Sequence, residues 1–514
     1  MTTHTFDAPQ LDAPRGDLDQ KPGARHTRSA LLRRYQGQAT RREVRRDVLT
    51  VGAWSLIATS IALFLADNGI RYFATLGGAI TALGIIAGLV ATAFMCLMLV
   101  LTARVPVIDA TLGQDRATSL HAKLGRGMVF GLLAHGILLV YGYALSDKIT
   151  PIATFTQLWT SSTDFIWACV AFLMLGVVGI SSMVALRRKY PYEVWFGIHL
   201  TTYAAILASI PHQFSMSGML AEGTWGRPFW AAMWLVTGGL MLAYRVILPI
   251  LASLTHQFTV SRVTPVGPDA VSIEVTGRKV KELQARGGHW LNWRFLTPEL
   301  AGQPHPFSLS AEPTDSTLRI TVRNLGEGTA RLMSLKPGTK VAIEGPYGMF
   351  TDASRTTDKV VLLGAGIGIA PIRALLESTE FAPGDAAVIL RASTPDELYL
   401  LDEVVALCEA KGASLALLVG PRAGQSWVPV TDAGATLIDF VPWAAEADVY
   451  VCGPNPWMEA VLADVAACGI PAGARREVRL VTAPAAQARG AIRYAGSSPQ
   501  PCARPGRVLY WPRD

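Results

Sequence analysis

The stretches HAKLGRGMVFGLLAH at residues 121–135 and HLTTYAAILASIPH at residues 199–212 each begin and end with a histidine. Both lie in or beside apolar sequence long enough to cross a bilayer, where an ionisable side chain is costly and usually marks a functional site. Neutral imidazole is a common axial ligand of haem iron. A rise of about 1.5 Å per residue separates the two histidines of each stretch by roughly 20 Å along a helix. Two such helices could hold two stacked haems through His121, His135, His199 and His212.

An ideal helix places the two histidines on the same face in the first pair but not in the second pair. With about 3.6 residues per turn, a side chain 14 residues along the helix returns to within about 40° of its start. Thirteen residues leave it about 140° away, so the second pair requires a distorted helix. Pro211, directly before His212, explains such a distortion, because proline removes a backbone donor and clashes one turn back. The alternative is that each histidine is a packing or interfacial residue, but two pairs at matched spacing favour the metal interpretation.

The composition of the 514-residue chain combines a membrane half with a soluble half. Long apolar runs dominate residues from about 49 to 251, whereas residues from about 256 to 475 have an ordinary globular composition with regular glycine and proline. The six cysteines show neither a CxxC pair nor zinc or iron–sulfur spacing, so we expect no disulfide framework and no cysteine-bound cluster. Six runs approach the roughly 20 residues that cross a bilayer, and they span about 49–66, 76–102, 124–145, 165–186, 194–210 and 229–251.

Charge predicts the orientation of the spans. The net charge of +7 is not spread evenly, because residues 25–46, just before the first span, are strongly basic. Nucleic-acid binding would also explain a cluster of arginines, but this position favours a cytoplasmic anchor under the positive-inside rule. The loops after the second and fourth spans are basic too, so we expect both ends of the chain in the cytoplasm. Residues before Arg25 are rich in Asp, Pro and Gly, and we expect them to be disordered.

This topology pairs the histidines by depth. The third and fifth spans both run outward, so His121 and His199 share the inner level, and His135 and His212 share the outer level. Three arginines near the inner face could meet haem propionates, or could simply follow the positive-inside rule; they are Arg126, Arg187 and Arg188.

From about residue 258 the pattern changes to short alternating strands with frequent turn residues, namely FTVSRVTPV, AVSIEVTGR, TLRITVRNL and KVAIEGPYG. This pattern predicts a small antiparallel barrel. The barrel contains His305-Pro306-Phe307-Ser308-Leu309-Ser310, followed later by Gly326-Glu327-Gly328-Thr329. The glycines permit close approach of the backbone to a phosphate, and the hydroxyl of Thr329 can donate a hydrogen bond to it.

A parallel α/β pattern follows the barrel. The strand KVVLL at residues 359–363 runs into Gly364-Ala365-Gly366-Ile367-Gly368-Ile369-Ala370-Pro371 and then into a helix. Strand, glycine turn and helix in this order place a pyrophosphate at a helix N-terminus. The next strand, AAVILRAS, ends at Arg391 and Ser393, which could bind the 2′-phosphate that distinguishes NADPH from NADH; the alternative is a surface arginine at a strand end. A later strand, ADVYVCGP, ends at Cys452-Gly453-Pro454, where a small polar residue could lie against a nicotinamide.

Taken in order, these motifs resemble the ferric reductase and NADPH oxidase superfamily, and the soluble half resembles ferredoxin–NADP reductase. The resemblance covers about residues 50 to 475 and rests on HPFSLS, GAGIGIAPI, RAS, VCGPNPWM and the histidine spacings of 14 and 13 residues, the second of which is the gap that the family uses. It implies that the HPFSLS segment contacts FAD, that the glycine loop and the VCGP segment receive NADPH, and that two b-type haems bind the four histidines. The candidate cofactor-binding residues outside the membrane are His305, Pro306, Phe307, Ser308, Leu309, Ser310, Gly328, Thr329, Gly364, Gly366, Gly368, Ile369, Ala370, Pro371, Arg391, Ser393, Cys452, Gly453 and Pro454.

The expected fold is that of a multi-domain membrane protein. It consists of an all-α six-helix transmembrane bundle, an antiparallel β-barrel FAD domain and an α/β parallel-sheet nucleotide-binding domain. Family members usually end in a tail whose aromatic ring covers the flavin, whereas the residues after Arg479 lack strand or helix periodicity. Tyr510 or Trp511 could replace that ring. The expected limits are 1–47 for a basic, disordered N-terminus, 48–252 for the haem-binding domain, 256–350 for the FAD domain, 357–475 for the NADPH domain and 476–514 for the atypical tail.

The function that the resemblance implies is electron transfer across the membrane. Electrons would pass from cytoplasmic NADPH through FAD to the inner haem and then to the outer haem, with no acid or base supplied by the protein. The acceptor would be a ferric chelate, dioxygen or a periplasmic partner protein. An alternative from another class is a transporter whose membrane histidines relay protons, with a regulatory nucleotide-binding domain. Transporters often show internal repeats and helices broken at corresponding places, and this sequence shows neither.

Overall fold

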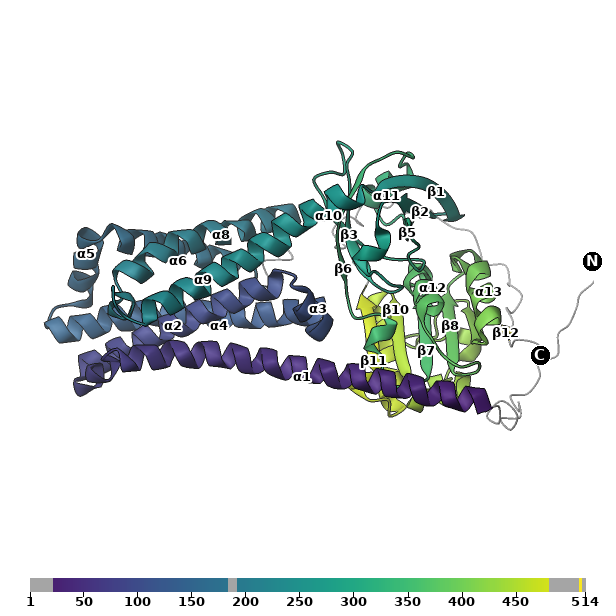
Figure 1. Ribbon diagram of the computed structural model, residues 1–514, viewed down its shortest axis with the longest axis horizontal. Coiled ribbons are helices and arrows are strands. Elements are labelled where there is room, and N and C mark those ends of the chain that lie inside the picture. The colour runs from purple at the N-terminus through teal and green to yellow at the C-terminus, as the bar shows by residue number, and fades with distance from the viewer. Residues whose placement is uncertain (1–21, 184–191, 480–507, 511–514) are drawn as a thin grey trace, which may run out of the picture. The chain divides into compact units, whose positions relative to one another are not determined.

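The computed structural model of the protein describes residues 22–183, 192–479 and 508–510. Its internal contacts divide the chain into two compact units. One, the membrane unit, is Glu43–Ile250, and the other, the reductase unit, combines Met1–Arg42 with Leu251–Asp514. The membrane unit is helical, and the reductase unit contains every described strand (Figure 1).

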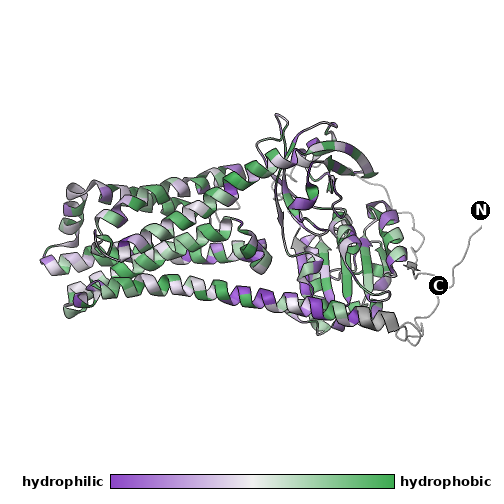
Figure 2. Ribbon diagram, in the orientation of Figure 1, coloured by the Kyte–Doolittle hydropathy of each residue, from purple (hydrophilic) through white to green (hydrophobic). Residues whose placement is uncertain are grey.

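The membrane unit contains the six predicted spans. Among the described residues, six helices are long and apolar enough to cross a membrane, and green, hydrophobic residues are frequent along the membrane unit in Figure 2. The prediction of a six-helix transmembrane bundle is therefore confirmed. The helices that form this unit wholly or in part are α1 (Pro22–Ala66), η2 (Gly69–Ala74), α2 (Leu76–Thr102), α3 (Pro106–Leu112), α4 (Gln114–Asp147), α5 (Pro151–Ser161), α6 (Thr163–Ser181), α8 (Tyr192–Ser215), η3 (Gly218–Leu220), α9 (Gly226–Leu242), the π-helical turn η4 (Ala243–Ile247) and α10 (Leu248–His256).

The basic N-terminal segment differs from the expectation. The sequence predicted disorder over residues 1–47, but α1 is a continuous helix from Pro22, so residues 22–47 are helical. Ala, Leu, Gln and Arg are good helix formers, and the side chains of Leu31 and Tyr35 on this segment are buried. Residues 1–21 lie outside the described part of the chain.

Two other helices extend past their apolar runs. α4 begins at Gln114 rather than near residue 124, so His121 lies well inside it. α8 continues to Ser215 and includes Pro211 and His212. Hydropathy marks only the part of a helix that lies in hydrocarbon, and polar helix formers extend it beyond that limit.

Small residues bring α2 and α4 into close contact. A Cβ at Gly84 would lie 3.1 Å from the side chain of Leu138, and a Cβ at Gly131 would lie 3.0 Å from that of Ala91. Because lipid is as apolar as the helices, such close packing replaces apolar burial as the source of association. Large apolar side chains instead face outward, as Leu173 does with 67% of its surface exposed.

The reductase unit contains two small antiparallel sheets with strand orders β1-β2-β5 and β4-β3-β6. Isolated bridges at Leu309–Ile320 and Thr259–Lys340 connect the two sheets. A shared core between them includes the fully buried side chains of Ile273, Trp293 and Phe295. This part of the unit is formed by β1 (Thr259–Gly267), β2 (Ala270–Thr276), η5 (Val280–Leu283), β3 (Trp290–Phe295), β4 (His305–Ser308), β5 (Thr317–Arg323), α11 (Glu327–Met333), β6 (Val341–Tyr347) and η6 (Asp352–Ser354).

The remaining sheet has the order β11-β10-β7-β8-β9-β12, and its first five strands are parallel. Every residue of β7 and β8 is buried, which is typical of a parallel sheet covered on both faces. The α/β nucleotide-binding fold predicted from the sequence is thus confirmed. The elements are β7 (Val360–Ala365), η7 (Gly366–Gly368), α12 (Ile369–Ser378), β8 (Ala386–Ala392), η8 (Pro395–Glu397), α13 (Leu401–Lys411), β9 (Ser414–Val419), η9 (Val430–Asp432), α14 (Leu437–Phe440), η10 (Ala444–Glu446), β10 (Asp448–Gly453), α15 (Asn455–Ala467), η11 (Ala472–Ala474), β11 (Arg475–Arg479) and β12 (Val508–Tyr510).

The C-terminal tail contributes one strand that the sequence pattern did not predict. β12 pairs antiparallel with β9 and places Tyr510 opposite Leu415. A free strand edge offers unpaired backbone groups, so even a weakly patterned segment can add to it. Trp511 and the side chain of Tyr510 lie outside the described residues.

Candidate functional site

The first pair of histidines meets between two helices. His121 on α4 and His199 on α8 have ring centres 6.1 Å apart, with an angle of 63° between the ring planes. The Nδ1–H of His121 donates to the carbonyl of Met98 on α2, 3.3 Å away. Trp195 stacks on His199 with ring centres 5.1 Å apart. A hydrogen bond at Nδ1 leaves Nε2 of the same imidazole available as a metal ligand.

The second pair combines His135 on α4 with His212 on α8. The Nδ1–H of His135 donates to the carbonyl of Gly84 at 2.9 Å. A Cβ at Gly88, one turn further along α2, would lie 2.5 Å from the same Nδ1, so only glycine leaves room for this ring. Glycine at residue 88 is thus part of the site.

The residue after His212 connects α8 to α9. The side-chain oxygen of Gln213 accepts hydrogen bonds from the indole N–H groups of Trp230 at 2.7 Å and Trp234 at 3.1 Å. Trp230 is buried. These bonds hold the end of α8 in place just beyond Pro211, where the sequence predicted a distorted helix.

The donor set fits haem iron better than a metal bound by protein alone. The described residues contain no group of three or more His, Cys, Asp and Glu side chains placed to hold a metal ion. Haem iron takes its equatorial ligands from the porphyrin, so two imidazoles suffice. With metal–nitrogen bonds of about 2 Å, two axial imidazoles would have ring centres roughly 6 Å apart, which agrees with 6.1 Å at His121 and His199. The Nδ1 atoms of His199 and His212 are buried and have no hydrogen-bond partner in the part of the chain that the structure describes.

The arginines proposed to meet haem propionates are only partly described. Arg126 lies on α4 and is exposed. Arg187 and Arg188 lie outside the described residues. Their role at the haem stays a prediction.

The HPFSLS segment forms β4 and the turn after it. His305 pairs with Trp293 on β3, and Phe307 pairs with Leu291. The indole N–H of Trp293 donates to the carbonyl of Phe307 at 3.1 Å. The ring of His305 stacks parallel to that of Phe307, with ring centres 6.0 Å apart. The buried tryptophan fixes the backbone of the predicted flavin segment.

Two polar atoms of this segment fit a missing ligand. The Nε2 atom of His305 and the hydroxyl of the fully buried Ser310 have no hydrogen-bond partner among the described residues. Burial, reinforced by Arg294, lowers the pKa of His305, so its imidazole is neutral near pH 7. A buried polar atom without a partner is costly, and both atoms are able to bond to a flavin.

Gly328 and Thr329 lie at the start of α11, next to the same segment. A Cβ at Gly328 would lie 3.9 Å from the ring of His305. The hydroxyl of Thr329 donates to the carbonyl of Gly326 at 2.9 Å and accepts from the N–H of Leu325 at 2.8 Å. In this structure the hydroxyl closes the local turn, so binding a phosphate would require it to exchange a partner.

The glycine loop and the VCGP segment meet at one edge of the parallel sheet. β7 and β10 are neighbours, with Gly364 opposite Cys452. A Cβ at Gly368 would overlap the carbonyl of Cys452, so the loop and the strand end are in contact. Burial raises the pKa of the Cys452 thiol, which therefore stays protonated near neutral pH. Ligands of open α/β sheets bind at the carboxyl ends of the strands, where the strand order reverses, and β7 and β10 occupy that position.

Arg391 lies at the same edge, at the end of β8, but its guanidinium is buried. It donates to the carbonyls of Gly420 at 2.6 Å and of Ala392. Burial, with the nearby charge of Arg422, lowers its pKa. The exposed Ser393 donates its backbone N–H to Glu397 at 3.0 Å. In this structure Arg391 binds protein carbonyls, so its role with a 2′-phosphate stays a prediction.

A charge network that sequence analysis missed connects the flavin segment to the nucleotide-binding domain. The carbonyl of Ser310 accepts from Arg319 on β5 at 2.9 Å and from Arg373 on α12 at 3.4 Å. Glu403 on α13 binds both arginines, at 2.7 Å and 2.8 Å. No local pattern marks these residues, because they come from three separate elements.

The comparisons with known proteins match both halves of the chain. Residues 87–210, which include three of the four membrane histidines, match the family model of the ferric reductase like transmembrane component. A ferric/cupric reductase transmembrane component 1 of Candida albicans is 26% identical over 292 residues, covering 55% of this chain and 35% of that protein.

Shorter matches to flavin-dependent and NAD-linked proteins are also found. A flavohemoprotein of Xylella fastidiosa is 27% identical over 195 residues, covering 36% of this chain and 49% of that protein. A probable dihydroorotate dehydrogenase B (NAD(+)), electron transfer subunit, of Methanothermobacter thermautotrophicus is 30% identical over 205 residues, covering 38% of this chain and 72% of that protein. The chain spans about half the length of the flavohemoprotein that it matches. A ferric reductase-like transmembrane domain is thus joined in this chain to a flavin reductase-type module.

Proposed function

We propose that this protein transfers electrons from cytoplasmic NADPH through FAD and two bis-histidine haems to an acceptor on the other side of the membrane. The observation that carries the proposal is the facing pair of His121 and His199, whose ring centres lie 6.1 Å apart on two membrane helices. His135 and His212 would hold the second haem one level further out. Bound FAD and haem would supply the hydride-accepting and one-electron chemistry, while the protein supplies binding and orientation.

The chain's own residues have positioning roles in this proposal. Met98 and Gly84 accept the Nδ1–H bonds that orient His121 and His135. The Nε2 of His305 and the hydroxyl of Ser310, for which the described residues supply no hydrogen-bond partner, would bond to the flavin. The edge formed by Gly368 and the carboxyl end of β10 would receive the nicotinamide nucleotide, with Arg391 and Ser393 as candidates for its 2′-phosphate.

The proposed orientation follows from charge. Residues 25–46 and the loops after the second and fourth spans are basic, and the described residues contain an even number of candidate spans. The positive-inside rule then places both termini and the reductase unit in the cytoplasm. The acceptor outside is proposed as a ferric chelate or dioxygen, with a periplasmic partner protein as a third case.

The test is an absorption spectrum of the purified membrane protein, before and after anaerobic addition of NADPH with FAD. We expect the spectrum of a six-coordinate b-type haem at about two haems per chain, reduced by NADPH. A preparation that lacks a haem band even when expressed with haem precursor contradicts the proposal and favours the histidine-relay transporter. An assay of oxygen consumption against ferric citrate reduction then identifies the acceptor.

A further inference from the structure

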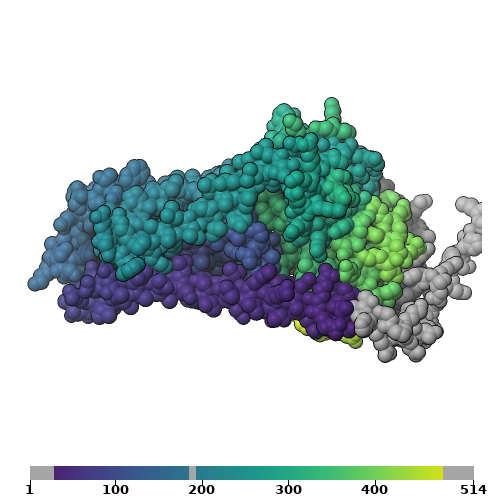
Figure 3. All heavy atoms as spheres, in the orientation of Figure 1, coloured from purple at the N-terminus to yellow at the C-terminus, as the bar shows by residue number. Residues whose placement is uncertain are grey.

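The first part of α1 is bound to the nucleotide-binding domain along one face. Over residues 28–42 the covered side chains recur every three or four positions. Leu31 and Tyr35 are buried and Arg28, Gln38 and Arg42 are half-buried, whereas the side chains on the opposite face are exposed. This periodicity is that of a helix docked on a surface. In the space-filling view, the start of α1 lies against the green atoms of the nucleotide-binding domain (Figure 3).

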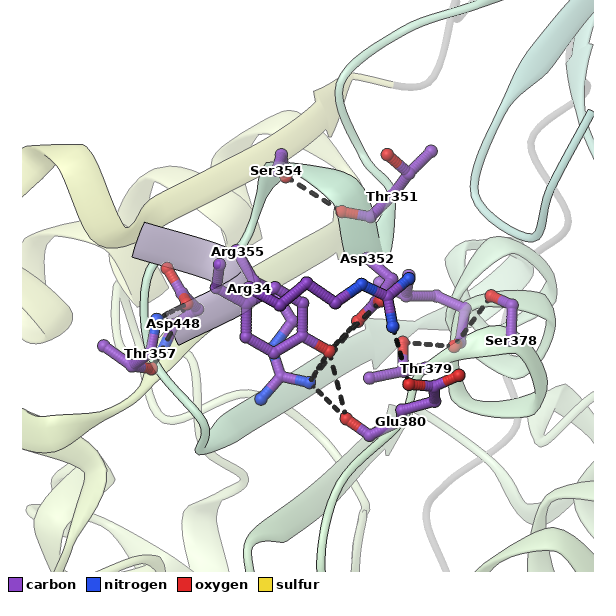
Figure 4. Close-up of polar contacts among 12 residues, drawn as sticks. Arg34, Thr351, Asp352, Ser354, Arg355, Thr357, Ser378, Thr379, Glu380 and Asp448 are labelled. Atoms are coloured by element: carbon purple, nitrogen blue, oxygen red, sulfur yellow. Dashed lines mark hydrogen bonds and ion pairs between the residues drawn. The ribbon is translucent and has the colours of Figure 1, made fainter. Parts of the chain in front are cut away.

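The centre of this contact is the fully buried Tyr35. Its hydroxyl donates to the carboxylate of Asp352 at 2.9 Å and lies 3.2 Å from Nη1 of Arg355. The guanidinium carbon of Arg355, which has no exposed surface, lies 4.4 Å from the centre of the tyrosine ring. Arginine stacks on aromatic faces through cation–π attraction, most strongly where water is excluded. Figure 4 shows Asp352 and Arg355 directed toward this contact together with Glu380.

Arginines on both sides of Tyr35 form further polar contacts with the domain. Arg28 forms two hydrogen bonds with the carboxylate of Asp385, at 2.6 Å and 2.9 Å, and the Asp385 side chain is only 4% exposed. Arg42 donates to the carbonyl of Ser354 at 2.9 Å. Arg34 pairs with Glu380 at 2.7 Å (Figure 4), but both side chains are exposed, so this pair contributes little. The buried tyrosine and the bidentate arginine pair therefore hold most of the segment.

The docking surface is connected to the nucleotide edge of the sheet. Ser354 in η6 shares a hydrogen bond of 2.9 Å with the hydroxyl of the buried Tyr450. Tyr450 lies on β10, two residues before Cys452. The helix docked on η6 is therefore linked through Ser354 to the strand whose carboxyl end is proposed to receive the nicotinamide.

We infer that residues 28–42 are a docking arm that holds the nucleotide-binding domain while the flavin passes electrons to the inner haem. The arm is covalently continuous with the first membrane span, so the reductase unit has a second attachment besides the link through α10. This inference rests on the proposed function. Without the arm, the nucleotide-binding domain keeps one covalent link and samples more positions, and transfer to the haem slows. Reduction of a soluble dye by the flavin does not depend on the distance between the flavin and the haem, so it should not change.

The experiment compares Tyr35→Ala, Tyr35→Phe and the control Gln36→Ala in the full-length holoprotein in lipid nanodiscs. Gln36 is exposed beside Tyr35, and all three variants keep the trypsin sites at Arg33, Arg34 and Arg41. We expect trypsin to cut within the arm of Tyr35→Ala at least about tenfold faster than in wild type, because the docked helix must open before it is cleaved. Tyr35→Phe, which loses only the hydroxyl, should be cut at an intermediate rate, and Gln36→Ala should match wild type.

The same variants are then mixed with NADPH under anaerobic conditions. Haem reduction should slow about tenfold in Tyr35→Ala, while reduction of a soluble dye stays within about twofold of wild type. Wild-type cutting rates in both Tyr35 variants would overturn docking, and unchanged haem reduction in an undocked Tyr35→Ala would overturn its role in electron transfer. If wild-type haem is not reduced by NADPH at all, the proposed function fails and the role inferred for the arm fails with it. A helix bound to lipid instead would show cutting that changes with anionic lipid content and not with Tyr35, which also contradicts the inference.

Discussion

The backbone carbonyl of His289 accepts a hydrogen bond of 2.9 Å from the N–H of Leu309, inside the predicted flavin segment. The Nδ1 of the same imidazole accepts the backbone N–H of Arg286 at 3.0 Å. Protonation at Nδ1 would remove that acceptor. Protonation of the His289 side chain would therefore disturb the loop around residues 286–289, whose backbone supports residues 305–310.

Acid is expected to release FAD through this contact. Burial, and then the charge of Arg286, lower the pKa of His289 from 6.5 to about 4. Between those values the unfolded state binds more protons than the folded state, so the stability contributed by neutral His289 is present above about pH 6.5 and is lost as the pH falls toward 4. Because the side chain is half-buried and solvent screens part of this effect, we expect a loss of stability on the order of 1 kcal/mol. The fluorescence of FAD released during a titration from pH 7.5 to 4 measures this loss of stability. His289→Gln should flatten the plot of fluorescence against pH between about 6.5 and 4. A curve that His289→Gln leaves unchanged contradicts this assignment.

Gly88→Ala is expected to displace the outer haem. The added Cβ would lie 2.5 Å from the Nδ1 of His135, so the ring must move. The haem content should fall from about two per chain to about one, as measured by the pyridine haemochrome assay. Gly136→Ala is the matched control, because a Cβ at Gly136, directly after His135, meets nothing within 4 Å. Equal haem contents in the two variants would show that His135 does not hold a haem.

Gly368→Ala is expected to disturb the nucleotide edge. Its Cβ would overlap the backbone of Cys452, so either the glycine loop or the end of β10 must shift. A shift of this kind moves the reacting groups apart, and dye reduction by NADPH should fall by about a hundredfold. Gly473→Ala, at an open position of the same domain, should keep wild-type activity. Full activity in Gly368→Ala would mean that the loop does not contact the nucleotide.

Arg391→Ala separates a phosphate role from a structural one. If Arg391 binds the 2′-phosphate, KM for NADPH rises about tenfold while KM for NADH stays constant. The buried bonds to the carbonyls of Gly420 and Ala392 also predict a lower melting temperature for the variant. A lower melting temperature with equal changes in both KM values would leave Arg391 with a structural role alone.

Glu403→Ala is expected to destabilise the contact between the flavin segment and the nucleotide-binding domain. Burial alone would raise the pKa of Glu403, but Arg319 and Arg373 lower it below its usual value. Its contribution is therefore present above about pH 4.5 and is lost on acidification. Without the carboxylate, the largely buried guanidinium groups of Arg319 and Arg373 lose their shared counter-charge. We expect the free energy of unfolding to fall by about 2 kcal/mol. Thermal unfolding at pH 7 measures the loss, and the exposed Glu409 on the same helix provides the control variant Glu409→Ala. Similar melting temperatures for the two variants would contradict this role.

The sequence by itself determined the parts of this protein that depend on local pattern. Apolar length identified the six spans, since hydrocarbon thickness fixes how long a crossing helix must be. Alternation predicted β1, β2, β5 and β6, and the glycine turn after β7 predicted the start of the nucleotide-binding fold. β3 and β4 were not delimited, because WLNWRF and HPFS are strands through their pairing with each other and with β6.

Only the tertiary structure decided which distant residues meet. It placed the rings of His121 and His199 face to edge, left space at Gly88 for His135, and buried Arg391 against backbone carbonyls. It also docked Tyr35 on Asp352, 317 residues further along the chain. Such contacts depend on the packing of separate elements, and the pattern of neighbouring residues carries no information about a partner that far away.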